Sequence, residues 1–383
     1  MFSRIAVLAA AVAVVAGLTV PAAAASRNLQ VGIYDDSQIL GNPGRTFPLL
    51  RRLRPQIVRV NMLWGGPGGV ARRKPRRATD PDDPAYNWGA YDEVVTLAAR
   101  SRIRVLFSIV GTPGWANGRK RWNRAPRRAS DLRAFAYAAA TRYSGLHAPD
   151  GSDQPLPAVR LWLAWNEPNN PVFLWPQYRR VGRGRYVIQS GRTYARICNA
   201  VVRGVKATLL RGEKVGCGVT APRGNNRARG RRPSVSPLAF LRAMKKGGAR
   251  GFDAYAHHPY YSGPSERPSQ PPSSKTAVTL GNIGDLVREL TRLYGRKRVW
   301  ITEYGYQTKP PDPFYGVSWR AQARYLAQAF AIARRAPSID MMLWFLLRDE
   351  RRVRGRDGWQ SGLVTVNGRR KPAFRTFQRV RRS

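Results

Sequence analysis

The chain has 383 residues, of which 67 are Lys or Arg and only 22 are Asp or Glu, so its formal net charge is +45. A nucleic-acid-binding protein usually concentrates its basic residues on one face or helix, whereas here Arg is scattered from Arg27 to Arg382. This distribution disfavours specific nucleic-acid binding and leaves either a solvated basic surface or attraction to an anionic cell wall, polymer or membrane surface. With only Cys198 and Cys217, a disulfide-rich scaffold and a cysteine-rich metal site are excluded.

Residues 1–25 have the pattern of a secretory signal peptide. A single Arg precedes an apolar stretch from Ile5 to Val20, and a run of alanines from Ala22 to Ala25 follows. The alternative is an uncleaved anchor helix, but the stretch is only marginally long enough for a bilayer and the alanines favour cleavage. No later segment reaches about 18 uninterrupted apolar residues. We therefore expect a secreted, extracellular protein whose mature form has no transmembrane anchor.

Eight short apolar segments recur along the rest of the chain. They begin at Leu29, Gln56, Ile103, Val159, Lys214, Phe252, Arg298 and Ile339. Their β-branched and aromatic content and nearly continuous hydrophobicity are typical of parallel strands that are buried on both faces. Segments with helical spacing lie between them, at 91–101, 130–144, 192–209, 237–248, 282–295 and 318–335.

This alternation predicts a (β/α)8 TIM barrel, formed by one domain over residues 28–383. A doubly wound open sheet is the alternative, but no Gly-rich nucleotide-binding loop follows the first strand. The residues beyond a minimal barrel fall mainly in connections that follow strands, such as 168–190 and 221–236, on the face where barrel enzymes hold their active sites. Cys198, in a helical segment, and Cys217, in the next strand, form either a disulfide or two buried thiols.

Two glutamates, Glu167 and Glu303, stand just past the last apolar positions of the fourth and seventh predicted strands. A carboxylate at the end of a barrel strand is held rigidly at the rim, where a substrate can reach it. Hydrolysis of a glycosidic bond needs a proton donor and a second carboxylate, about 5 to 5.5 Å apart when the second attacks carbon directly. We therefore interpret the two glutamates as a catalytic pair, of which one must be protonated and the other ionised before the reaction.

The surroundings of this pair resemble the signature of the clan A (β/α)8 glycoside hydrolases, especially the cellulase-like and β-xylosidase-like families. The matching motifs are Asn166-Glu167-Pro168 after the fourth strand and the isolated Glu303 at the end of the seventh. The resemblance implies that Glu167 is the acid/base and Glu303 the nucleophile of a retaining double displacement. It also implies that Asn166 hydrogen-bonds the sugar 2-hydroxyl, and that the chemistry requires no metal or other cofactor.

Five further residues match the same families. Arg59 resembles the basic residue that supports the nucleophile from beneath, and Trp115 lies in a segment similar to their Pro-x-Trp turn. His258 and Tyr260 resemble a His-x-Tyr sequence whose Tyr orients the nucleophile, and Trp344 resembles the aromatic floor beneath the bound sugar. The closing stretch resembles the families' ending in a final helix. The chain departs from many cellulase-like members in lacking a His after the third strand.

These observations predict a secreted retaining glycoside hydrolase that cleaves O-glycosidic bonds in a β-linked oligo- or polysaccharide. We expect Arg59 to favour the charged form of Glu303, and that charge to raise the pKa of Glu167. The alternatives are a non-catalytic carbohydrate-binding barrel, motivated by the missing His, and a charge-driven binder of anionic polymers. Aromatic residues in or near the loops are candidates for stacking on sugar rings: Trp64, Trp88, Phe173, Trp175, Tyr178, Tyr261, Phe314, Tyr315 and Trp359.

Overall fold

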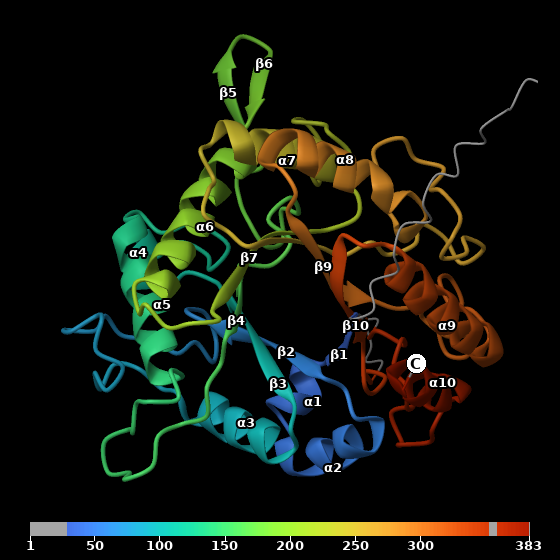
Figure 1. Ribbon diagram of the computed structural model, residues 1–383. Helices are drawn as coiled ribbons and strands as arrows, with labels where there is room; N and C mark the ends of the chain where they lie inside the picture. Colours follow the sequence, from blue (N-terminus) through green and yellow to red (C-terminus); the bar gives the residue numbers. More distant parts are fainter. Residues whose placement is uncertain (1–28, 352–357, 383) are drawn as a thin grey trace, which may run out of the picture.

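The computed structural model describes residues 29–351 and 358–382, so the predicted signal peptide lies outside the described residues. Eight parallel strands close into a barrel in the order β1, β2, β3, β4, β7, β8, β9, β10 (Figure 1). They are β1 (Gln30–Tyr34), β2 (Ile57–Leu63), β3 (Arg104–Val110), β4 (Leu161–Ala164), β7 (Lys214–Thr220), β8 (Ala254–His257), β9 (Arg298–Tyr304) and β10 (Ile339–Phe345). Each lies in one of the eight predicted segments, which confirms the (β/α)8 barrel.

Helices surround the barrel on its outer side (Figure 1). The longer ones are α2 (Pro43–Leu53), α3 (Gly89–Arg100), α5 (Ala129–Arg142), α6 (Ser190–Lys206), α7 (Pro237–Lys246), α8 (Ile283–Tyr294), α9 (Trp319–Arg335) and α10 (Pro372–Arg382). Short turns of helix form α1 (Asp36–Ile39), α4 (Gly114–Asn117) and η1 (Leu280–Asn282). Sequence periodicity did not indicate α2, which contains Pro48 in its interior. Within the described residues, none of these helices combines the length and the apolar character that a membrane span requires.

An antiparallel hairpin, β5 (Tyr178–Gly182) and β6 (Arg185–Ile188), projects from the connection between β4 and α6 (Figure 1). The sequence indicates only a connection here, since these residues lack the apolar alternation of a half-buried strand. Every residue of β5 after Tyr178 is exposed. The far end of the hairpin therefore belongs to the outer surface, whereas Tyr178 and Ile188 at its base pack against the core.

The two faces of each barrel strand belong to different environments. An inner apolar layer of ten side chains, including Ile57, fills the barrel, and a larger core lies between the strands and the helices. Because successive residues of a strand face opposite sides, Val58 and Val60 pack outward in β2, whereas Ile57, Arg59 and Asn61 point inward. Arg59 and Asn61 therefore lie above the inner apolar layer, toward the carboxyl ends of the strands.

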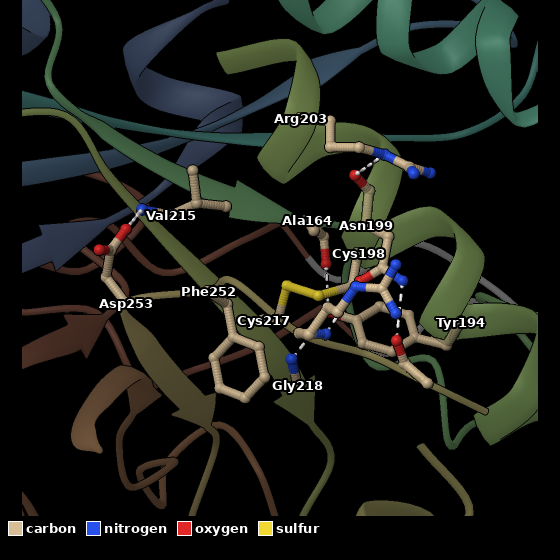
Figure 2. The surroundings of a disulfide bond; sticks show 12 residues. Ala164, Tyr194, Cys198, Asn199, Arg203, Val215, Cys217, Gly218, Phe252 and Asp253 are labelled. Carbon is tan, nitrogen blue, oxygen red and sulfur yellow. Dashed lines mark hydrogen bonds between the residues drawn. A yellow bond between two sulfur atoms is a disulfide. The ribbon is translucent and has the colours of Figure 1, made fainter. Parts of the chain in front are cut away.

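Figure 2 shows a disulfide between Cys198 of α6 and Cys217 of β7, both fully buried, with their Cα atoms 5.9 Å apart. This pairing decides between the two alternatives that the sequence left open. One turn earlier on α6, the Tyr194 hydroxyl donates to the carbonyl of Ala164 and accepts from the N–H of Gly218, both at 2.7 Å. Gly218 has a φ of 92°, a conformation that favours glycine. Helix α6 thus fixes the ends of β4 and β7.

Candidate active site

A cavity of about 580 Å³ opens at the carboxyl ends of the barrel strands. Its lining consists of Tyr34, Asn61, Asn166, Glu167, Asn170, Phe173, Ala221, Pro222, Arg223, Tyr260, Tyr261, Glu303, Gln307, Tyr315, Phe345 and Trp359. Seven of these residues are aromatic, and aromatic faces beside a few convergent polar groups are typical of ligand sites. Four of the nine candidate loop aromatics, Phe173, Tyr261, Tyr315 and Trp359, belong to the lining, whereas Trp64 and Trp88 are buried in the outer core.

Glu167 lies three residues beyond the end of β4, in a strained segment of backbone. Trp165 and Glu167 have φ values of 74° and 37°, which non-glycine residues rarely adopt. The Trp165 N–H donates to the carbonyl of Ile109 on β3, and the Glu167 N–H donates to the carbonyl of Val219 on β7, each at 2.8 Å. Such strain costs on the order of 1–3 kcal/mol per residue and persists only where the surroundings enforce it. Here both neighbouring strands enforce it and direct the carboxylate into the cavity.

Glu303 reaches the cavity because of an irregularity in β9. Tyr304 follows Ile301 by three positions, but their partners on β10, Met342 and Trp344, are only two positions apart. An extra residue in one strand is a β-bulge, which changes the direction of the side chains beyond it. Without it, strict alternation would direct Glu303 toward the helices, on the same side as Ile301.

Arg59, fully buried on β2, contacts residues that follow β4 as well as residues of β9. Its Nη1 donates to Glu303 Oε1 at 2.8 Å, and its Nη2 donates to Asn166 Oδ1 at 2.6 Å. The guanidinium carbon also lies 4.4 Å from the centre of the Tyr34 ring. Since the Asn166 oxygen is occupied by Arg59, the amide nitrogen of Asn166 is the group available to donate into the cavity.

His258 stands between the two glutamates, and its contacts determine which ring nitrogen carries the proton. Arg59 Nη1 lies 3.1 Å from His258 Nε2. A guanidinium can only donate, so Nε2 accepts and the proton of the neutral ring is on Nδ1. Nδ1 lies 3.0 Å from Glu167 Oε1 and 3.5 Å from Glu303 Oε1. Burial lowers the pKa of His258 to about 3, which keeps the ring neutral.

Each carboxylate accepts two hydrogen bonds. Glu167 accepts from His258 Nδ1 and, at 3.0 Å, from Asn170 Nδ2, whereas Glu303 accepts from Arg59 and, at 3.1 Å, from the Tyr260 hydroxyl. Burial raises the pKa of Glu167, with the Asn170 hydrogen bond acting in the opposite direction. A raised pKa for Glu167 is the predicted direction. The sequence-based prediction attributes it to the charge of Glu303, whereas its main cause is desolvation by burial. Glu167, His258 and Glu303 each offer a ligand atom, and these atoms lie within 4.8 Å of one another.

This spacing would also suit a metal ion, but the charge distribution disfavours one. The Arg59 guanidinium lies against both Glu303 Oε1 and His258 Nε2. A cation held by Glu167, His258 and Glu303 would therefore be close to a second, buried cation that already neutralises one of its ligands. The arrangement suits proton transfer and nucleophilic attack better than metal binding.

Two of the aromatic residues predicted to bind the sugar lie outside the cavity. Trp344 is fully buried in the outer core, and its Nε1 donates to the carbonyl of Ser361 at 2.9 Å. Alternation along β10 explains this placement, because Trp344 faces the helices and the next residue, Phe345, faces the cavity. Trp115 lies on α4, where its Nε1 donates to the carbonyl of Ala71 at 2.9 Å. Neither tryptophan belongs to the cavity lining, and Phe345 provides the aromatic surface of β10.

The predicted residues that the structure brings together are Arg59, Asn166, Glu167, His258, Tyr260 and Glu303. Five further polar residues of the lining were not predicted: Tyr34, Asn61, Asn170, Arg223 and Gln307. Asn61 could have been found, because it follows Arg59 by two positions on the inward face of β2. Asn170 follows Glu167 by three positions in a turn whose shape the sequence does not reveal.

No protein-family model matches the chain, and no curated protein matches its sequence. A family 39 glycoside hydrolase from the gut symbiont Bacteroides cellulosilyticus has a TM-score of 0.62 at 18% identity, over 93% of this chain and 64% of its own. A glucosidase from Croceicoccus marinus has a TM-score of 0.67 at 16% identity, over 93% and 67%. A monomeric beta-xylosidase from Caulobacter crescentus has a TM-score of 0.57 at 17% identity, over 92% and 67%. This chain thus spans about two thirds of their lengths, and it has the (β/α)8 barrel fold of these glycoside hydrolase structures.

Proposed function

We propose that the protein is a secreted retaining glycoside hydrolase that cleaves O-glycosidic bonds in a β-linked oligo- or polysaccharide. The observation that carries the proposal is the pair of carboxylates in the aromatic-lined cavity, with oxygens of Glu167 and Glu303 within 4.8 Å of each other. Retaining glycosidases hold their two carboxyl groups about 5–5.5 Å apart, whereas inverting enzymes need about 6.5–9.5 Å to admit a water molecule. The close spacing therefore supports direct attack by one of the two glutamates.

The contacts of the two glutamates support different roles. Glu303, held by Arg59 and Tyr260, attacks the anomeric carbon, while Glu167 donates its proton to the leaving oxygen as the glycosidic bond breaks. In the second step Glu167 accepts a proton from water, the water oxygen bonds to the anomeric carbon, and Glu303 leaves as a carboxylate. The raised pKa of Glu167 suits the acid, because the group must be protonated when the substrate binds. The free amide nitrogen of Asn166 is available to donate to a sugar hydroxyl.

Secretion is part of the same proposal. The signal-peptide pattern of residues 1–25 supports it. The Cys198–Cys217 disulfide supports it independently, since such bonds persist mainly in oxidising compartments. Expression in a bacterial host with a secretion pathway tests it: we expect the protein in the medium or periplasm, with a mass lower by that of the leader. An intact leader on protein that stays in the cytoplasm would contradict it.

Activity is tested by a screen of aryl β-glycosides together with β-glucan, xylan and mannan. On a cleaved substrate, NMR should detect the product first as the anomer of the same configuration as the substrate. Glu303→Ala should abolish hydrolysis, and azide should partly restore turnover by occupying the vacated position. Glu93→Gln, on the exposed surface of α3, is the matched control and should be fully active. Full activity in Glu303→Ala would refute the assignment; sugar binding without cleavage, identical in wild type and variants, would favour the non-catalytic barrel.

A further inference from the structure

We propose that the glycan bound in this cavity is anionic, and that Arg223 binds one of its acidic groups beside Glu167. The inference rests on the proposed function of the cavity and adds the class of substrate. Arg223 lies in the connection that follows β7, is exposed, and lines the cavity. Its charge acts on Glu167, where it opposes the effect of burial on the pKa of that carboxyl.

Arg223 is available to a ligand. Among residues 29–351 and 358–382 its hydrogen-bond partner is the carbonyl of Ser262, which accepts from Nη1 at 3.2 Å, and it has no carboxylate partner there. A guanidinium carries five N–H donors in a planar fork that matches the geometry of carboxylates and similar oxyanions. The other arginine of the site, Arg59, is fully buried and already paired with Glu303. Arg223 is therefore the cation of the cavity wall that a substrate can reach.

Further exposed arginines lie in the same connection as Arg223 and on the β5–β6 hairpin, and we call this set the basic ridge. It consists of eight exposed arginines on the β5–β6 hairpin and in the connection after β7: Arg179, Arg180, Arg183, Arg185, Arg227, Arg229, Arg231 and Arg232. The two segments are in contact, because Arg229 Nε lies 3.4 Å from the Tyr186 hydroxyl and the Tyr178 hydroxyl donates to the carbonyl of Ser234 at 3.1 Å. Both segments follow the carboxyl ends of barrel strands, β4 and β7, which is the side of the barrel that carries the cavity.

Nothing in this part of the chain neutralises the basic ridge. Glu213 is the only acidic residue between positions 168 and 252. It immediately precedes β7 (Lys214–Thr220) and so lies at the amino end of the barrel, away from the cavity. Elsewhere many arginines are paired, as Arg142 is with Asp92 and Arg292 is with Glu289. In the described residues no arginine of the basic ridge has such a carboxylate partner.

An anionic polysaccharide accounts for both the accessible guanidinium of Arg223 in the cavity wall and the basic ridge outside it. Exposed single charges contribute little to affinity, but a surface of one sign beside a cleft raises the local concentration of an oppositely charged ligand and its association rate, by about 10- to 1000-fold. Inside the cavity, a bidentate contact between a guanidinium and an oxyanion adds orientation. The basic ridge should therefore affect the association rate of the polysaccharide and the salt dependence of its binding. Arg223 should determine which sugar ring of the polysaccharide occupies the cavity.

Binding and charge are tested with polymers that differ only in their acidic groups. The probes are glucuronoxylan and its carboxyl-reduced form, and chondroitin sulfate and unsulfated, carboxyl-reduced chondroitin. Calorimetry on the inactive Glu303→Ala protein measures binding whether or not hydrolysis occurs. At least one acidic polymer should bind about tenfold or more tightly than its neutral form, and Arg223→Gln should reduce this preference to below about threefold. Desulfated chondroitin that keeps its carboxylates separates the two groups: binding as tight as that of chondroitin sulfate identifies a carboxylate as the preferred group, and binding as weak as that of the neutral form identifies a sulfate.

A control removes the same kind of charge from the other end of the barrel. Arg51, Arg52 and Arg54 border a separate hollow of about 650 Å³ and can be replaced together by Gln. This triple variant lowers the net charge by more than Arg223→Gln and should retain the preference. Equal binding of the acidic and neutral forms, or equal loss in the two variants, overturns the inference. Failure to cleave any glycoside overturns the proposed function instead, because the binding preference is measured separately.

Discussion

The hydrogen bond from Asn170 to Glu167 should determine where the activity of the enzyme declines at high pH. Asn170 Nδ2 donates to Glu167 Oε2 at 3.0 Å and favours the charged carboxylate, which opposes the raising effect of burial on the pKa of Glu167. Glu167 must be protonated to act as the acid. Asn170→Ala removes a contribution that lowers this pKa, so the alkaline limb of kcat/KM should move to higher pH.

The size of the shift follows from the strength of the bond. A hydrogen bond to a charged group is worth about 1.5–3 kcal/mol. The lower value applies, since the Glu167 side chain is 14% exposed and water can replace part of the interaction. At 1.36 kcal/mol for each tenfold change, 1.5 kcal/mol corresponds to a displacement of about one pH unit. Because the pH profile of kcat/KM reports the free enzyme, substrate contacts of Asn170 change its height rather than its midpoint.

The assay is kcat/KM on an aryl β-glycoside across pH for wild type, Asn170→Ala and Asn170→Asp. The Asp variant replaces the hydrogen-bond donor with a negative charge. Its alkaline limb should therefore lie at a pH at least as high as that of the Ala variant. Asn123→Ala is the control, because Asn123 Nδ2 donates to the carbonyls of Pro171 and Val172 in the same connection without touching Glu167. An alkaline limb that stays in place or moves to lower pH in Asn170→Ala would refute the reasoning.

Three further predictions concern stability and binding. Replacing both Cys198 and Cys217 by Ala should lower the free energy of unfolding by about 3 kcal/mol, because the bond closes a loop of 19 residues; an unchanged guanidinium midpoint would contradict this. Burial raises the pKa of Asp36 to about 7, so the folded state binds the extra proton and unfolding free energy falls as pH rises from about 4 to 7; Asp36→Asn should flatten that dependence in denaturant titrations. Phe345→Ala should raise KM several-fold, whereas Trp344→Phe should lower the melting temperature and leave KM unchanged; the reverse pattern would restore Trp344 as the sugar-binding residue.

The barrel could be predicted from the sequence because its strands are nearly continuous apolar segments with breakers between them. The sequence did not indicate helix α2, whose Pro48 interrupts the helical pattern. Nor did it reveal the β5–β6 hairpin, whose strands are rich in arginine. The buried residues Phe47, Leu50 and Leu53 of α2 fall on both sides of Pro48, and only Tyr178 and Ile188 of the hairpin pack against the core. Neither element therefore has the long, uninterrupted apolar pattern that identifies a helix or a strand in a single sequence.

The direction of side chains in the site depends on strand register. Family motifs indicate the inward residue correctly on β9 but not on β10. Strict alternation along β10 would have placed Phe345 inward and Trp344 outward, but we followed the family resemblance and chose Trp344. On β9, strict alternation would have failed, because the bulge reverses the direction of Glu303. The direction of a side chain at a strand end depends on how neighbouring strands pair. A single sequence does not contain that pairing, so it cannot show whether alternation or a family motif gives the correct direction.

The different roles that we propose for the two glutamates depend on one buried cation. Arg59 can only donate hydrogen bonds, so its contacts with Glu303, Asn166 and His258 fix the state of each partner. It pairs with Glu303 at 2.8 Å, leaves the Asn166 amide nitrogen free to donate into the cavity, and places the His258 proton on the nitrogen that faces Glu167. An uncharged residue at position 59 would leave Glu303 buried without its counter-ion and allow His258 to adopt the other tautomer. The asymmetry between acid and nucleophile is thus set from β2, a strand that contributes neither glutamate.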